Sequence, residues 1–177
     1  MASIIKANQL QDFGGNSIIT SDGAGNLTTQ KINYPAFLAH NTANQDISEA
    51  TDTKVSFGTV PIDTDNAFSD SKFTVPSGKA GKYVFNGVLQ TSSVGQSEYQ
   101  YGVWYVYKNG SAVSQQMADN RNNNLRDISA VFNFMLDLSE GDYIEIYVQL
   151  GTSGSSQRIK GQTSFPLTWF SGYRIGS

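Results

Sequence analysis

The chain has 177 residues and a mass of 19.2 kDa, the size of one ordinary domain with at most a short appendage. Its net charge of −3 excludes the Lys/Arg excess that nucleic-acid binding requires. There is no cysteine and a single histidine, His40, which excludes a disulfide framework, a thiolate metal site and a His-based triad. No stretch reaches 18 apolar residues and residues 1–11 lack a signal-peptide pattern, so we expect no membrane insertion.

Residues 1–34 alternate short apolar pairs with glycine-rich turns. Strands are predicted at 16–20 and 27–30, and Asp22-Gly23 between them is a hairpin turn signal. The segment has too few apolar residues for a core, so we expect it to fold against a partner or against copies of itself. The residues expected to attach it to a larger particle are apolar: Ile4, Ile5, Leu10, Phe13, Ile18 and Ile19.

From residue 35 the pattern changes to short strands separated by turns. Strands are predicted at 82–90, 98–108, 127–138, 143–150 and 165–175. Asn109-Gly110 predicts a tight hairpin whose return strand begins near residue 112. Inward-facing residues are expected in three of these strands: Tyr83, Phe85 and Leu89, then Phe132, Phe134, Leu136 and Leu138, then Ile144, Ile146, Val148 and Leu150. Short strands at regular spacing predict an all-β sandwich or jelly roll.

Tyrosines form two rows on these strands. Strict alternation places four tyrosines of 98–108 on one face, and two further tyrosines lie opposite the apolar face of 143–150. Such a row either packs into the sandwich or is buried between subunits, where tyrosine is enriched. The candidate trimer interface therefore consists of Tyr99, Tyr101, Tyr105, Tyr107, Tyr143 and Tyr147.

The loop at 119–127 is rich in amide and guanidinium groups, which are hydrogen-bond donors typical of glycan recognition. The candidate ligand or receptor loop comprises Asp119, Asn120, Arg121, Asn122, Asn123, Asn124 and Arg126. Two other interpretations remain open: a hydrated connection between strands, or pairing of Arg121 or Arg126 with acidic groups of a neighbouring subunit.

The sequence gives little indication of a catalytic or metal-binding site. There is no G-x-S-x-G motif, and His40 is interpreted as a surface or interface residue, so we expect no enzyme and no cofactor. Asp63, Asp65 and Asp70 offer alternate oxygens that could bind calcium, but their spacing is not that of an EF-hand. A solvated acidic loop is the favoured interpretation.

Six short motifs follow one another over residues 35–175. They are Pro35-Ala36-Phe37-Leu38-Ala39, Val55-Ser56-Phe57, Phe73-Thr74-Val75-Pro76 with Gly81-Lys82-Tyr83-Val84-Phe85, Lys108-Asn109-Gly110, Leu138-Ser139-Glu140-Gly141-Asp142-Tyr143-Ile144, and Phe170-Ser171-Gly172-Tyr173. In this order they resemble the C1q domain family, with two extra residues between Pro76 and Gly81. The resemblance implies a ten-stranded jelly roll of two sheets that assembles as a homotrimer and works by multivalent binding. It implies no fixed set of ligand-binding residues.

Residues 4–30 are similar in their glycine, serine and threonine content to the N-terminal attachment segments of phage tail-fibre, head-fibre and decoration proteins. We therefore expect a virion structural protein, with residues 1–34 as attachment segment and 35–177 as a C1q-like domain exposed on the particle. The expected partners are copies of itself, capsid or tail proteins, and a host-surface glycan. The alternative is a stand-alone lectin-like module of cellular origin.

Overall fold

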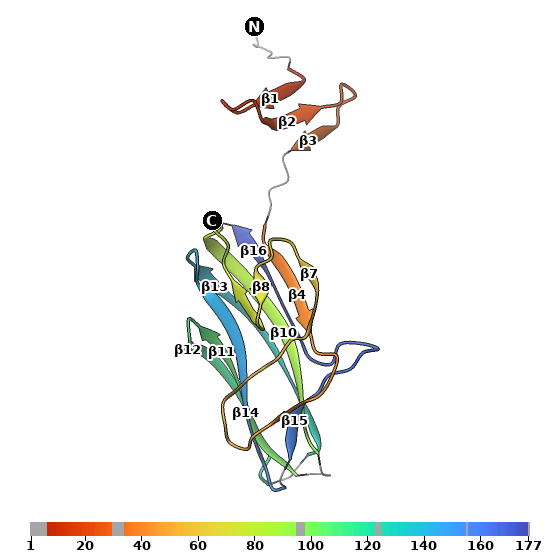
Figure 1. Cartoon of the computed structure of the whole chain (residues 1–177), viewed down its shortest axis with the longest axis vertical. Helices are drawn as coiled ribbons and strands as arrows, with labels where there is room; N and C mark the ends of the chain where they lie inside the picture. The colour runs from red at the N-terminus through yellow and green to blue at the C-terminus, as the bar shows by residue number, and fades with distance from the viewer. Residues whose placement is uncertain (1–6, 30–33, 95–97, 123–124, 155, 177) are drawn as a thin grey trace. The chain divides into compact units, whose positions relative to one another are not determined.

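The computed structural model describes residues 7–29, 34–94, 98–122, 125–154 and 156–176. The chain divides into two compact units, Met1–Asn33 and Tyr34–Ser177, and every regular element in the described ranges is a β-strand (Figure 1). Among those residues no helix has the length and apolar character needed to cross a membrane.

The smaller unit is a three-stranded antiparallel sheet. Its order is β1 (Gln9–Gln11), β2 (Ser17–Ser21), β3 (Leu27–Thr29). The strands predicted at 16–20 and 27–30 are confirmed, as is the turn that contains Asp22-Gly23. A β-bulge interrupts the pairing of β1 with β2 after Leu10.

The larger unit is a sandwich of two sheets. The seven-stranded sheet runs β5 (Gln45–Ile47), β15 (Gln157–Ile159), β10 (Gly81–Ser93), β16 (Trp169–Gly176), β4 (Ala36–His40), β7 (Thr59–Asp63), with β13 (Asp127–Leu138) also paired to β10. The six-stranded sheet runs β12 (Ser111–Asp119), β11 (Tyr99–Lys108), β14 (Tyr143–Thr152), β9 (Lys72–Thr74), β8 (Phe68–Ser69), with β6 (Thr53–Lys54) also paired to β14. The described part of this unit thus has thirteen strands rather than ten, because short edge segments pair as strands of two or three residues.

The long strands follow the predicted pattern. The Asn109-Gly110 hairpin is confirmed, since both residues have the positive φ that a two-residue turn between twisted strands requires, 52° and 79°. The last strand begins at Trp169 rather than at residue 165. Pro166 lies in that interval and has no amide hydrogen to donate to a ladder.

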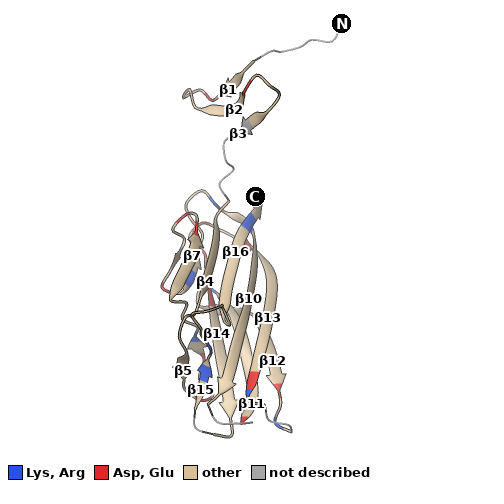
Figure 2. Ribbon diagram, turned by 90° about the vertical axis from the view of Figure 1, so that its right-hand side faces the viewer, with Lys and Arg blue, Asp and Glu red and all other residues tan. Residues whose placement is uncertain are grey.

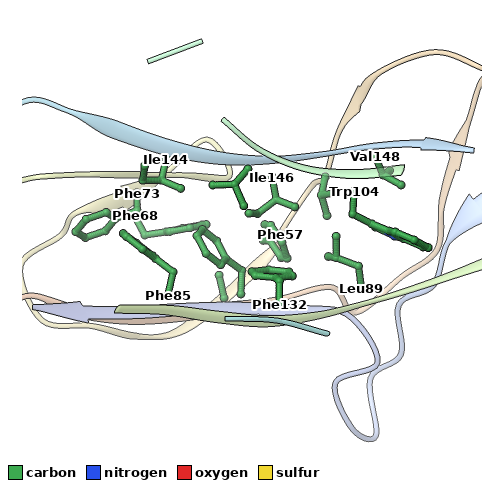
Figure 3. Close-up of a cluster of buried hydrophobic side chains, with 14 of the residues drawn as sticks. Phe57, Phe68, Phe73, Phe85, Leu89, Trp104, Phe132, Ile144, Ile146 and Val148 are labelled. Atoms are coloured by element: carbon green, nitrogen blue, oxygen red, sulfur yellow. The ribbon is translucent and has the colours of Figure 1, made fainter. Parts of the chain in front are cut away.

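The core lies between the two sheets and is dominated by aromatic rings (Figure 3). The expected inward faces are confirmed: Tyr83, Phe85 and Leu89 are fully buried, as are the apolar residues of β14. Phe37 from β4 is a hub of the cluster, with ring centroids of Phe68, Phe73 and Phe170 4.8–4.9 Å from its own. Inward-facing aromatic residues of β4, β8, β9, β10, β13 and β16 thus make a continuous layer of rings.

A glycine in β16 gives these rings their space. A Cβ atom at Gly172 would lie 2.5 Å from Cδ1 of Phe85 and 2.8 Å from Cε1 of Phe37, closer than any real contact. The position therefore requires a residue without a side chain.

Candidate self-association surface and ligand loop

The outer face of the seven-stranded sheet carries three regular rows of side chains, which we call the sheet face. Because alternate residues of β10 point into the core, Val84, Asn86 and Val88 point outward. The pairing register with β13 and β16 extends each of them into a row: Met135–Val84–Tyr173, Asn133–Asn86–Ser171 and Val131–Val88–Trp169.

The two outer rows of the sheet face are apolar and open to solvent. Val131 is 67% exposed, Met135 58% and Tyr173 46%. The middle row is made of amides and a hydroxyl, and the Asn133 side-chain amide donates to the side-chain oxygen Oδ1 of Asn86. Figure 2 shows that β10, β13 and β16 are mostly free of charge along their length. An uncharged surface on which exposed apolar rows flank a polar one is typical of a protein–protein contact surface.

A second incomplete surface lies between β12 and β13, which we call the open edge. Among the described strands, β12 pairs only with β11 and β13 only with β10, so each ends its sheet. A hollow between them is lined by Trp104, Phe132 and Ile146, with Ser114 and Gln116 at its rim. Trp104 is only 6% exposed, yet its indole Nε1 has no hydrogen-bond partner in the described structure. Of the β12 side chains only Ala118 is half-buried, where it packs against the core, and the others are exposed, so the sandwich is not closed here.

Only one of the candidate interface tyrosines lies in the core. The expectation that Tyr99 shares a face with the other tyrosines of β11 is wrong, because a β-bulge between Tyr99 and Tyr101 reverses the alternation. Tyr99 is fully buried, its hydroxyl accepts a hydrogen bond from Thr91 Oγ1 at 3.2 Å, and burial raises its pKa.

The remaining five tyrosines lie half-buried on the outer face of the six-stranded sheet. Their contacts are largely satisfied within the chain: the rings of Tyr107 and Tyr147 stack at 4.3 Å, and the Tyr107 hydroxyl donates to Asp52 Oδ2 at 3.2 Å. Partial burial, together with the Asp52 carboxylate, raises the pKa of Tyr107. A role for these five residues in subunit contacts stays a prediction, but the sheet face is the more exposed of the two surfaces.

The candidate ligand loop connects β12 to β13. Arg121 folds back, with its Nη1 2.8 Å from Asp119 Oδ2 and its guanidinium 4.9 Å from the centre of the Tyr101 ring. Arg126 Nε lies 2.7 Å from Asp127 Oδ2. Asn123 and Asn124 lie outside the described residues. Both arginines are thus paired within the chain, although each side chain is more than half exposed.

The three aspartates considered for calcium have separate partners. Both carboxylate oxygens of Asp63 accept backbone hydrogen bonds, from Ala67 at 2.8 Å and Phe68 at 2.9 Å. Asp65 accepts from Thr64 Oγ1 at 2.7 Å, and Asp70 lies 3.3 Å from Lys54. Within the described residues, no three histidines, cysteines or acids come together as a metal site. The chain's histidine, His40, is a half-buried residue of β4 opposite Trp169.

Four of the six candidate attachment residues fall in the described part of the smaller unit. Leu10, Phe13 and Ile18 are exposed and Ile19 is half-buried, while Ile4 and Ile5 lie outside the described residues. The residues that sequence reasoning missed are those of the sheet face. Their signal was that β13 is apolar on both of its faces, with Val131 and Met135 opposite Phe132 and Phe134.

Comparison with known proteins supports the fold. No family model matches the sequence, and no curated protein matches it. Among solved structures, the globular domain of zebrafish complement 1qA protein is similar with a TM-score of 0.55 and 16% identity, covering 80% of this chain and 97% of that chain. Eiger TNF from S. frugiperda is similar with a TM-score of 0.56 and 9% identity, covering 81% of this chain and 94% of that chain. The chain is therefore an all-β, two-sheet sandwich with the fold shared by C1q and TNF domains.

Proposed function

We propose that this chain is a homotrimeric binding module without enzymatic activity. The observation that carries the proposal is the sheet face, where neutral apolar rows flank a row of amides on the largest sheet of the molecule. A soluble monomer gains nothing from exposing Val131 and Met135 on a regular strand, whereas a copy of the chain can cover them.

The sheet face and the open edge are different surfaces, which favours head-to-tail contacts that close into a ring of copies. When two different surfaces of one chain bind each other, the contact is head-to-tail, and a suitable rotation closes it into a cyclic oligomer. The sheet face of one copy and the open edge of the next are the pair of surfaces we assign to this contact. The C1q-like fold, with the resemblance of its motifs, favours three copies.

Function would then follow from multivalency rather than from chemistry. Three identical copies of the ligand loop, each with two exposed arginine side chains, would convert weak single contacts into strong attachment through effective concentration. No positioned acid–base pair or nucleophile accompanies the loop in the described residues.

The oligomer test is the mass of the chain in solution by light scattering, expected at three times 19.2 kDa. Val131→Lys places a charge in the exposed sheet face and should yield monomers that keep the β-sheet circular dichroism of the wild type. The matched control, Ser69→Lys, adds the same charge to an exposed strand position in β8, at the end of the six-stranded sheet opposite β12, and should stay trimeric. Dissociation by the control alone would move the interface to the six-stranded sheet, and a monomeric wild type would overturn the proposal.

The proposed setting of this trimer is the surface of a virion, as a capsid decoration protein, a head fibre or a short tail fibre anchored by residues 1–34. Support comes from the composition of residues 4–30 and from their separation into a unit of their own. Antibodies against residues 35–177 should label particles from the source, on the capsid for a decoration or head-fibre protein and at the tail for a host-binding fibre. Deleting residues 1–34 should abolish incorporation. An unlabelled particle population, with glycan binding that survives the deletion, would instead indicate a cellular lectin-like module.

A further inference from the structure

The smaller unit contains two copies of a ten-residue repeat. In the turn between β1 and β2 the repeat places Asp12, Gly15 and Asn16, and in the turn between β2 and β3 the same residue types follow ten positions later, as Asp22, Gly25 and Asn26.

The two turns are built by the same hydrogen bonds. In the first, the Asn16 backbone N–H donates to Asp12 Oδ1 at 2.9 Å and the Asn16 side-chain amide donates to Asp12 Oδ2 at 3.0 Å. In the second, the corresponding donors of Asn26 lie 3.1 and 2.5 Å from the carboxylate of Asp22. In both cases these bonds lower the pKa of the aspartate, and a glycine with positive φ precedes the asparagine. Each turn is thus ordered by its own atoms.

The sheet that these turns connect has no interior. None of the side chains described in residues 7–27 is buried. A unit of this size, with no disulfide in the chain, cannot remove enough apolar surface from water to be stable by itself. The turns favour the strands, but something outside the unit must cover the sheet.

The bulge in β2 separates an apolar face from a polar one. Gln11 pairs with Ser17 and Leu10 with Ile19, so Ile18 is the extra residue. Gln9 donates a hydrogen bond to Ser17, which places Ser17 on the glutamine side. The other side presents Leu10, Ile19 and Leu27, of which Leu10 is 55% and Leu27 68% exposed.

We infer that the apolar face of this unit is covered by the same unit from other copies of the chain, so that residues 7–29 form a second self-association module. The faces of β1 and β2 and the first residue of β3 carry no charge, and Asp12 and Asp22 lie in the turns, so identical faces can meet without repulsion. The high local concentration of the units rests on the proposed homotrimer, which keeps three of them tethered together.

Because the chain has no cysteine, single cysteines report on this contact. Ile19→Cys on the apolar face and Thr20→Cys on the polar face are adjacent, half-buried positions of β2 and form a matched pair. The full-length variants would be treated with a short bis-maleimide and analysed on denaturing gels. Juxtaposed faces should cross-link Ile19→Cys on the order of tenfold faster than Thr20→Cys, whereas freely moving arms would cross-link both equally. Equal rates would overturn the inference.

Hydrogen exchange gives a second test, which does not depend on the reach of a cross-linking reagent. In the full chain, amides of β1–β3 should be protected from hydrogen exchange, Ile19→Lys should remove that protection, and Thr20→Lys should leave it. The mass of Ile19→Lys should stay at that of the wild type, because the sheet face is untouched.

The outcomes separate this inference from the proposed function. Selective cross-linking and protected amides in the full chain, with residues 34–177 alone monomeric, would support the N-terminal contact and overturn the homotrimer of the larger unit. A trimer with equal cross-linking and unprotected amides would do the reverse. Protection that arises only on assembled particles would assign the apolar face to another particle protein and overturn the inference.

Discussion

At the scale of single residues, packing in the core leaves some positions no freedom. Gly172 is one, because the rings of Phe37 and Phe85 occupy the volume that a side chain would need. The end of β16 is looser, and nothing lies within 4 Å of the position that a Cβ atom would occupy at Gly176.

We expect Gly172→Ala to lower the free energy of unfolding by about 1–3 kcal/mol, since the added methyl group forces the aromatic layer apart. Gly176→Ala, in the same strand, should change it by less than about 0.5 kcal/mol. Urea unfolding followed by circular dichroism measures both. Equal effects would mean that the aromatic layer can yield to the methyl group.

At the scale of elements, two turns hold each other at one end of the sandwich. Asp142, in the β13–β14 turn, lies 2.8 Å from Lys108 Nζ and accepts from Asn109 Nδ2 at 2.7 Å, at the β11–β12 hairpin. The Lys108 ammonium first, then the Asn109 amide and the Ser139 N–H, lower the pKa of Asp142 to about 2.

A lowered carboxyl pKa stabilises the fold above the pKa of the unfolded chain, and that contribution disappears as pH falls through the folded value. Asp142→Asn should therefore cost on the order of 1–2 kcal/mol at pH 7, and its deficit relative to the wild type should shrink between pH 4 and pH 2. Urea midpoints at pH 7, 4 and 2 test this. Glu49→Gln, an exposed carboxylate, serves as control and should follow the wild type at each pH. A deficit that does not depend on pH would mean that the charge of the Asp142 carboxylate does not contribute to holding the two turns together.

The alternation of apolar and polar residues predicts where the long strands lie, but it does not place every side chain on the correct face. Asn109-Gly110 and the period-two pattern of β10, β13 and β14 predict those elements and their buried residues, because local turn chemistry and burial act together there. Alternation failed at Tyr99, where a bulge shifts the register, and bulges carry no sequence signal here. The sheet face was missed for a different reason: Val131 and Met135 belong to a strand whose second apolar face is paired only across subunits in the proposed trimer.

At the scale of the whole molecule, the two units differ in whether each contains a hydrophobic core of its own. The residues of the core cluster all fall between Phe37 and Phe170, so the larger unit contains its own core. We expect residues 34–177 alone to keep the thermal midpoint and the oligomeric state of the full chain. Circular dichroism melting and light scattering of both proteins test this. A fall in midpoint greater than about 4 °C would show that the smaller unit contributes to the stability of the larger one.

The amide row across β13, β10 and β16 would also decide which chains can assemble together when related chains are made in the same cell. A contact formed only by valine, methionine and tyrosine would accept almost any apolar surface of similar size. With Asn133, Asn86 and Ser171 between the apolar rows, a foreign or misaligned subunit that covers the row with apolar atoms leaves amides without partners, at a cost of about 1–3 kcal/mol for each buried group. The row would thus make the chain selective for copies of itself and disfavour mixed assemblies with divergent relatives.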